Sequence, residues 1–130
     1  MGKNVLIIDS EPEVIESAGS ILEKLGHQVS GSKDGEEATN KIRQLKPDLI
    51  ILDLILHRKS GIMVYVDLKT NEAWKKIPVI INTKIKKKTF LRTLEELNRF
   101  YPQPLPEPEA YLEKPLKPDP FTKAIQQFLR

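Results

Sequence analysis

Two short apolar runs in this sequence of 130 residues each end on a carboxylate. Residues 4–9 read NVLIID and end on Asp9, and residues 49–53 read LIILD and end on Asp53. Each run predicts a strand that is buried on both faces, where a terminal charge is costly unless it is paired, binds a metal or lies at the rim of the sheet. For one isolated aspartate, a strand that simply meets solvent would be a sufficient explanation. The residues at the other strand ends indicate instead that these carboxylates belong to a functional site.

Two further runs end on residues that could act together with these acids. Residues 77–83 read IPVIINT and end on Thr83, and residues 110–114 read AYLEK and end on Lys114. Two adjacent carboxylates repel each other unless a cation joins them, and Mg²⁺ is the natural candidate because it binds one or two carboxylates and keeps sites for phosphate oxygens. An acid pair, a hydroxyl and an ammonium suit phosphoryl transfer with a carboxylate as nucleophile.

The elements that must position these residues alternate regularly along the chain. Strand patterns cover residues 4–9, 27–30, 49–53, 77–83 and 110–114. Helical patterns cover residues 12–25, 35–45, 62–71, 87–100 and 120–129. This alternation predicts an α/β fold, a flavodoxin-like (βα)5 three-layer sandwich whose parallel sheet has the order 2-1-3-4-5. That order makes strands 1 and 3 neighbours, so Asp9 and Asp53 lie side by side on one rim.

Two local patterns add detail. Ser10 and Glu13 have the spacing of a capping box, so we expect Ser10 to cap the first helix. Residues 101–109 contain four prolines at alternate positions, which predicts an extended, stiff connector. We interpret this Pro-rich segment as an insertion between helix 4 and strand 5 of a single domain that spans residues 1–130.

Composition narrows the functional classes. The chain has no cysteine, which excludes disulfides and thiolate catalysis, and no apolar run reaches the ~20 residues that a membrane span needs. The N-terminus enters a strand at once and leaves no room for a signal peptide, so we expect a cytoplasmic protein. Lysines 84, 86, 87 and 88 account for the net charge of +3. Because no aromatic residues are interleaved with them, a solvated helix start is favoured over a nucleic-acid site. An enzyme of the flavodoxin-like class is poorly supported, because no Gly-rich phosphate loop is present.

With these motifs in place, the whole chain resembles the receiver domain of two-component response regulators. The matching stretches are IIDSEPE at 7–13, LIILD at 49–53, Gly61, PVIINT at 78–83 and YLEKP at 111–115. The resemblance implies that Asp53 accepts a phosphoryl group from a histidine kinase or phosphotransfer protein. It also implies that Mg²⁺ is held by Asp9, Asp53 and the backbone carbonyl of Ile55.

The resemblance assigns the remaining roles as well. Thr83 corresponds to the switch hydroxyl, Tyr111 to the aromatic residue that follows its movement, and Lys114 to the residue that pairs with a phosphoryl oxygen. The surface of helix 4, strand 5 and helix 5 would then bind a downstream partner or a second copy of the chain. Such a stand-alone receiver is a signalling phospho-acceptor, with at most Mg²⁺-dependent self-phosphorylation and autodephosphorylation, and not an enzyme in the ordinary sense.

The sequence departs from the family pattern at the metal site. The second acid that usually follows strand 1 is Ser10 here, and Glu11 is the alternative ligand. Lys84 stands after Thr83, where the family mostly has a small residue; it could shield the pocket or add positive charge. These departures and the Pro-rich segment support an alternative function, a pseudo-receiver that acts as a phosphorylation-independent interaction module.

Overall fold

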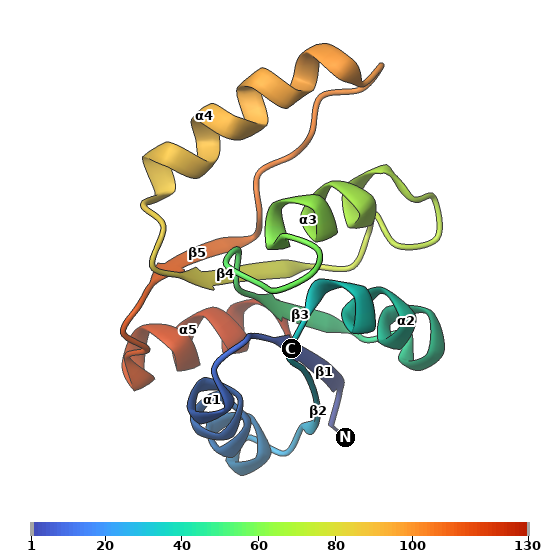
Figure 1. The fold of residues 1–130 in the computed structure, drawn as a ribbon. Coiled ribbons are helices and arrows are strands. Elements are labelled where there is room, and N and C mark those ends of the chain that lie inside the picture. Colours follow the sequence, from blue (N-terminus) through green and yellow to red (C-terminus); the bar gives the residue numbers. More distant parts are fainter. Residues whose placement is uncertain (1, 130) are drawn as a thin grey trace.

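The computed structural model describes residues 2–129, which form a parallel sheet covered by helices on both faces (Figure 1). Its strands are β1 (Asn4–Ile8), β2 (Gln28–Ser32), β3 (Leu49–Leu52), β4 (Val79–Thr83) and β5 (Ala110–Glu113). They are all parallel and lie in the order β2-β1-β3-β4-β5. The predicted flavodoxin-like fold and its strand order are therefore confirmed.

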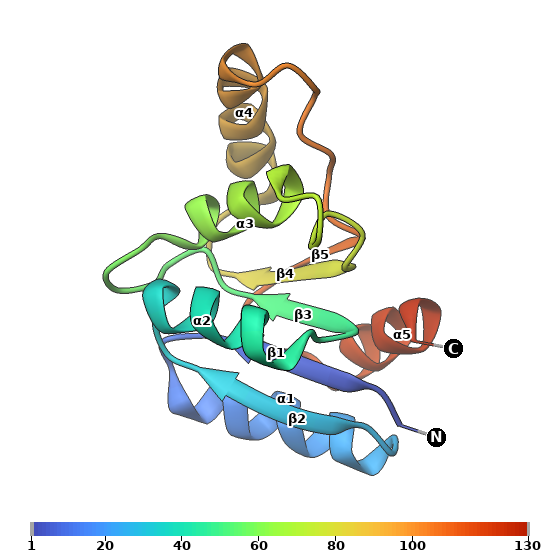
Figure 2. The ribbon, with the colours of Figure 1, turned by 90° about the vertical axis from the view of Figure 1, so that its right-hand side faces the viewer.

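The helices divide between the two faces of the sheet, as Figures 1 and 2 show from two sides. They are α1 (Pro12–Lys24), α2 (Gly35–Leu45), α3 (Gly61–Thr70), α4 (Lys87–Leu97) and α5 (Pro118–Phe128), with a 3-10 helix η1 (Asn98–Phe100) directly after α4. One core cluster joins α1 and α5 to the sheet, for example through Leu22 and Phe121. The other joins α2, α3 and α4, for example through Ile42, Tyr65 and Phe90.

The register of the sheet sets the positions of the strand-end residues. Ile8 of β1 is paired with Leu52 of β3, so the next residues along each strand, Asp9 and Asp53, lie beside each other. The backbone N–H of Asp53 donates to the carbonyl of Ile8 across 2.9 Å, which extends this pairing to the rim. The buried runs therefore place both carboxylates at the carboxyl edge of the sheet.

Of the two N-cap residues predicted for α1 and α2, one is confirmed and one is wrong. Asp34 caps α2, with its carboxylate accepting from the N–H of Glu37 across 2.8 Å. The expected cap of α1 by Ser10 is wrong: Glu11 is the N-cap residue, and no side chain caps this helix. Pro12 at the first position lowers the need for a cap, because it carries no backbone N–H.

The Pro-rich segment, residues 101–109, follows η1 and leads into β5 without helix or strand. Burial and hydrogen bonds anchor it to the rest of the fold. Leu105 is buried in the core with 7% of its surface exposed, and its backbone N–H donates to the side-chain oxygen of Asn98 across 2.6 Å. The hydroxyl of Tyr65 donates to the carbonyl of Pro106 across 2.6 Å. The segment is thus packed against α3 and does not merely connect two elements.

None of the helices within residues 2–129 combines the length and the apolar character that crossing a membrane requires.

Candidate functional site

Lys114, directly after β5, extends its ammonium group into a cluster of three carboxylates. Its Nζ lies 3.0 Å from Asp9 Oδ2, 2.9 Å from Asp53 Oδ2 and 2.5 Å from Glu11 Oε2. The side chains of Lys114, Asp9 and Asp53 are at most 4% exposed, whereas that of Glu11 is 42% exposed. The structure therefore brings together Asp9, Asp53 and Lys114, which the sequence predicted, and Glu11, the alternative metal ligand, at the solvent side.

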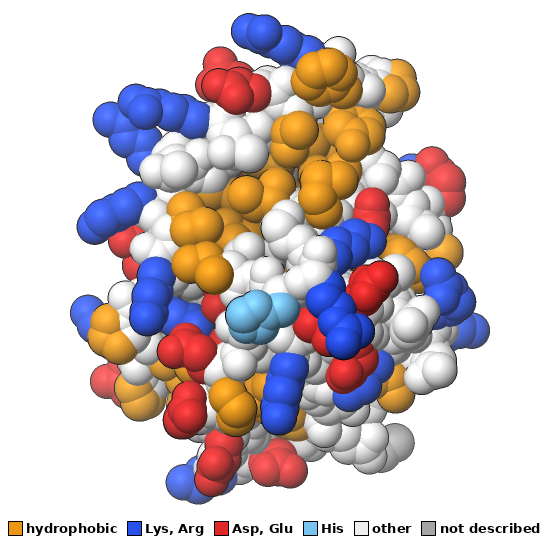
Figure 3. Space-filling model, viewed as in Figure 1, with side chains coloured by type: hydrophobic (Ala, Val, Ile, Leu, Met, Phe, Trp, Pro, Cys, Tyr) orange, Lys and Arg blue, Asp and Glu red, His pale blue; other side chains and the backbone are white. Residues whose placement is uncertain are grey.

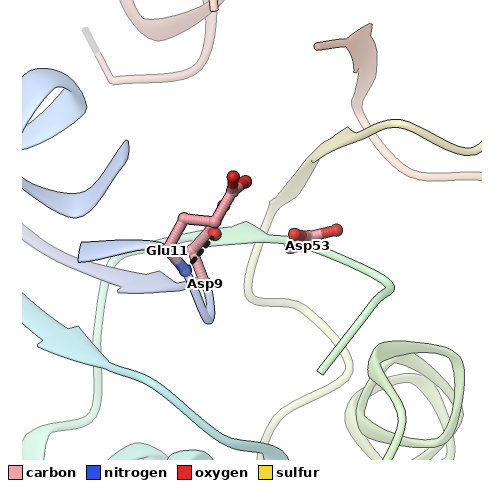
Figure 4. Close-up of side chains that lie close together, drawn as sticks. All are labelled: Asp9, Glu11 and Asp53. Atoms are coloured by element: carbon pink, nitrogen blue, oxygen red, sulfur yellow. Dashed lines mark hydrogen bonds between the residues drawn. The ribbon is translucent and has the colours of Figure 1, made fainter. Parts of the chain in front are cut away.

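Backbone hydrogen bonds hold the two buried carboxylates in place. The N–H of Glu11 donates to Asp9 Oδ1 across 2.9 Å, and the N–H of Ile55 donates to Asp53 Oδ1 across 3.0 Å. Figure 4 shows Asp9 and Glu11 on the turn that follows β1, and Asp53 at the end of β3. Each aspartate thus shapes the loop that follows its own strand and leaves its second oxygen for Lys114.

The charges in this cluster change the pKa values of its members. Burial raises the pKa of Asp9, helped by the nearby charge of Asp53 and opposed by hydrogen bonds from the Glu11 N–H and Lys114. The hydrogen bond from Lys114 lowers the pKa of Glu11. Burial would lower the pKa of Lys114, but its hydrogen bonds to Glu11, Asp53 and Asp9 outweigh that effect and raise it. Lys114 is consequently held in its charged form.

The same carboxylates fit a divalent cation. One oxygen each from Asp9, Glu11 and Asp53 lie within 4.8 Å of one another. Carboxylate oxygens are the ligands that Mg²⁺ prefers, and the ammonium of Lys114 shows that a positive charge is accommodated among them. Glu11, which the sequence offered as the alternative metal ligand, thus provides a third carboxylate beside Asp9 and Asp53.

Ser10 lies between the two loops of the site. Its hydroxyl donates to the backbone carbonyl of Ile55 across 3.4 Å. This carbonyl is the one that the resemblance implied as a metal ligand, so here it already has a hydrogen-bond partner. The contact also explains why Ser10 does not cap α1: its side chain turns to the loop after β3.

Thr83 and Tyr111 meet at the loop between β4 and α4. Thr83 is fully buried at the end of β4, and its hydroxyl oxygen accepts from the N–H of Ile85 across 3.5 Å. The hydroxyl of Tyr111 donates to the carbonyl of Ile85 across 2.7 Å, and its ring lies 5.6 Å from that of Phe90. Both predicted switch residues therefore contact one loop residue.

Glu113 makes contacts in this region that were not predicted from the sequence. Its carboxylate accepts from the backbone N–H of Lys87 across 3.3 Å and lies 3.8 Å from Lys86 Nζ. Glu113 thereby joins the end of β5 to the first residues of α4. The sequence does contain a signal for this contact: Glu113 is an acid next to Lys114, and three lysines stand at the start of the preceding helix.

Gly61 and Lys84 complete the surroundings of the site. A Cβ atom at Gly61 would lie 2.0 Å from the carbonyl oxygen of Asp53, so only glycine allows α3 to begin so close to β3. Lys84 is exposed and lines a groove of about 620 Å³ that also includes Glu11 and Lys114. Its charge also lowers the pKa of Glu11. Lys84 thus adds positive charge to the mouth of the site.

This chain resembles known proteins both in sequence and in structure. Residues 5–126 match the profile of a family described as "Response regulator receiver domain". The alkaline phosphatase synthesis transcriptional regulatory protein PhoP of Bacillus subtilis is 30% identical over the whole chain, which spans 50% of that relative's length. The polar-differentiation response regulator DivK of Brucella anthropi is 27% identical over 99% of the chain and 98% of its own length. The chemotaxis response regulator CheY4 of Vibrio cholerae superposes with a TM-score of 0.82 at 20% identity, covering 99% of this chain and 100% of its own.

Proposed function

Because this chain belongs to the response regulator receiver domain family of two-component systems, we propose that Asp53 accepts a phosphoryl group from a histidine kinase or phosphotransfer protein. The observation that carries the proposal is the position of Lys114 Nζ, 2.9 Å from Asp53 Oδ2 and 3.0 Å from Asp9 Oδ2. A buried nucleophile beside a fixed ammonium and further carboxylates is the arrangement that phosphoryl transfer requires.

The proposed step follows from these contacts. A carboxylate oxygen of Asp53 forms a bond to phosphorus while the N–P bond of a donor phosphohistidine breaks. The donor imidazole nitrogen keeps the electron pair of that bond and takes up a proton. Lys114 then pairs with a phosphoryl oxygen, which replaces its hydrogen bond to Asp53. Mg²⁺, held by Asp9, Asp53 and Glu11, would supply further positive charge for the phosphoryl oxygens.

The signal would leave the site through the loop between β4 and α4. The phosphoryl group carries ~1.5–2 negative charges on its oxygens, which would accept a hydrogen bond from the hydroxyl of Thr83. Thr83 contacts the N–H of Ile85, and Tyr111 contacts the carbonyl of the same residue. We therefore infer that α4, β5 and α5 change their shared surface, to which a downstream partner or a second copy would bind.

One observation favours a second candidate function, that of a pseudo-receiver. The hydrogen bond between Ser10 and the carbonyl of Ile55 joins the two loops of the site without a cation. The exposed Lys84 and the Pro-rich segment, interpreted as an insertion between α4 and β5, are further departures. In this case the domain would bind its partner whether or not Asp53 is modified.

Incubation with Mg²⁺ and acetyl phosphate distinguishes the two functions. We expect intact-mass spectrometry to find one added phosphoryl group on the unmodified sequence and none on Asp53→Asn. Asp119→Asn, an exchange at an exposed position of α5, is the matched control and should be phosphorylated normally. Absence of modification, together with no change in amide NMR shifts on addition of beryllofluoride, would support the pseudo-receiver instead.

A further inference from the structure

Helix α4 is covered by the rest of the molecule only in part. In Figures 1 and 2 it stands away from the sheet, and the Pro-rich segment runs from its far end past α3 to β5. Of its eleven residues, only Phe90 and Leu94 are buried. The helix nevertheless carries further leucines at positions 91 and 97, which are half-buried.

The Pro-rich segment fills the depth between α3 and α4. Leu105 is buried there, and the hydroxyl of Tyr65 on α3 holds the carbonyl of Pro106. The ring of Tyr65 meets that of Phe90 on α4 edge to face, with centroids 5.5 Å apart. Helices α3 and α4 are thus in contact through these buried rings, whereas their solvent-facing edges stay apart.

Between the two helices lies an apolar surface, which we call the α3–α4 groove. Its hydrophobic side chains pack on the core and keep part of their surface exposed: Leu56, Ile62, Ile85, Leu91, Leu97 and Tyr101. Figure 3 shows hydrophobic side chains gathered in a continuous band over this region, between the positions of α3 and α4 in Figure 1. Continuous exposed apolar surface of this kind marks interaction sites.

Helix α4 and the residues next to it contribute mainly positive charge beside the groove. Residues 86–99 contain five basic residues and two acidic ones, and the first turn of α4 has no acid. Among the described residues, Lys86 is the only one of the five that forms an ion pair, with Glu113 at 3.8 Å. Lysines at a helix start are unfavourable with the helix dipole. Glu113 contacts Lys86 and the backbone N–H of Lys87 there, so the ammonium groups of Lys87 and Lys88 would gain from a further, external acid.

From this juxtaposition of an apolar groove and unpaired lysines we propose that the α3–α4 groove binds an acidic amphipathic helix of a partner protein. A helix of this type places its apolar face in a groove between two helices and its carboxylates on the flanking cations. A second copy of the chain fits less well, because its own α4 would bring the same positive charge. The groove faces α3 and is distinct from the α4–β5–α5 surface invoked above.

Binding of a synthetic peptide tests the proposal directly. The probe is a fluorescent helical peptide of about 18 residues, or five turns, with leucines on one face and glutamates on the other. The control peptide carries lysines in place of the glutamates. We expect fluorescence anisotropy to show saturable binding of the acidic peptide only, with amide NMR shifts centred on α3 and α4.

Substitutions in the α3–α4 groove test whether the peptide binds there. Leu91→Gln on α4 and Ile62→Gln on α3 should each weaken binding, and the double charge reversal Lys87→Glu with Lys88→Glu should weaken it about tenfold. Lys123→Glu, an exposed charge reversal on α5, tests whether the loss of positive charge elsewhere on the surface matters and should change affinity little. Circular dichroism confirms that each variant is folded. Equal binding of both peptides, shifts confined to other surfaces, or self-association that Leu91→Gln abolishes would each overturn the proposal.

Discussion

The hydroxyl of Ser10 donates a hydrogen bond to the backbone carbonyl of Ile55 across 3.4 Å. This contact joins the loop after β1 to the loop after β3, directly beside the carboxylates of Asp9 and Asp53. It engages the carbonyl that the resemblance implied as a metal ligand. Ser10 therefore holds the two loops together in a way that needs no metal, and it should limit the affinity for Mg²⁺.

Ser10→Asp should raise the affinity for Mg²⁺ by at least about tenfold, because it adds a fourth carboxylate and removes the hydroxyl from Ile55. Isothermal titration calorimetry measures the change. Ser20→Asp, at an exposed position of α1, adds the same charge away from the site and should leave the affinity unchanged. Similar affinities in all three proteins would show that Ser10 does not limit metal binding.

Lys114→Met should lower the free energy of unfolding in EDTA by about 3 kcal/mol at pH 7 to 9, because it leaves Asp9 and Asp53 buried without a cation. Urea denaturation measures this loss. Added Mg²⁺ should restore part of it by taking the place of the ammonium. Lys117→Met, at an exposed position, is the control and should have little effect.

The effect of Lys114 should also depend on pH. Its hydrogen bonds to three carboxylates outweigh burial and raise its pKa in the folded protein above the ordinary value of 10.5. A raised lysine pKa stabilises fully below the unfolded value and less as pH rises towards the folded one. The stability difference between the unmodified protein and Lys114→Met should therefore decrease above pH 10.5. A difference that stays constant to pH 11 would contradict the proposed ion pairs.

Gly61→Ala should destabilise the fold by at least about 2 kcal/mol, because main-chain atoms must move to admit the methyl group. The new Cβ would lie 2.0 Å from the carbonyl oxygen of Asp53 and 2.5 Å from the Cα of Leu54. Since that movement displaces the loop of Asp53, Mg²⁺ affinity should fall as well. Urea denaturation and calorimetry measure the two effects.

Gly19→Ala provides the matched comparison. This glycine lies inside α1, and its Cβ would come no closer than 3.4 Å, to the Val29 side chain. Alanine is favoured over glycine within a helix by up to about 1 kcal/mol, so this variant should be as stable as the unmodified protein or more so. Equal losses in both variants would show that the approach of Gly61 to Asp53 is not special.

Much of this arrangement could be predicted from the sequence because parallel strands end at one edge of a sheet. The apolar runs before Asp9 and Asp53 determine both the strand pairing and the side on which the carboxylates lie. Ser10 was misassigned because its spacing to Glu13 fits a local cap, whereas a tertiary contact with Ile55 prevails. The burial of Leu105 could not be predicted, because alternate prolines restrict the backbone without indicating what it packs against.

Asn82, next to Thr83 on β4, presents a different kind of cost. It is 1% exposed, and neither its Oδ1 nor its Nδ2 has a hydrogen-bond partner among the described residues. A buried amide without partners costs about 1–3 kcal/mol. Asn82→Val removes this cost and favours the strand, so we expect the free energy of unfolding to rise by about 1–2 kcal/mol in urea denaturation.

Asn82→Asp is the comparison for Asn82→Val, because it keeps the size of the side chain and places a charge at the same buried position. It should destabilise the protein at pH 7 and do so less as pH falls, since protonation removes the buried charge. Asn82→Val has no group that titrates there, so its gain should not depend on pH. If Asn82→Val is instead less stable than the unmodified protein, the amide contributes an interaction that offsets its burial.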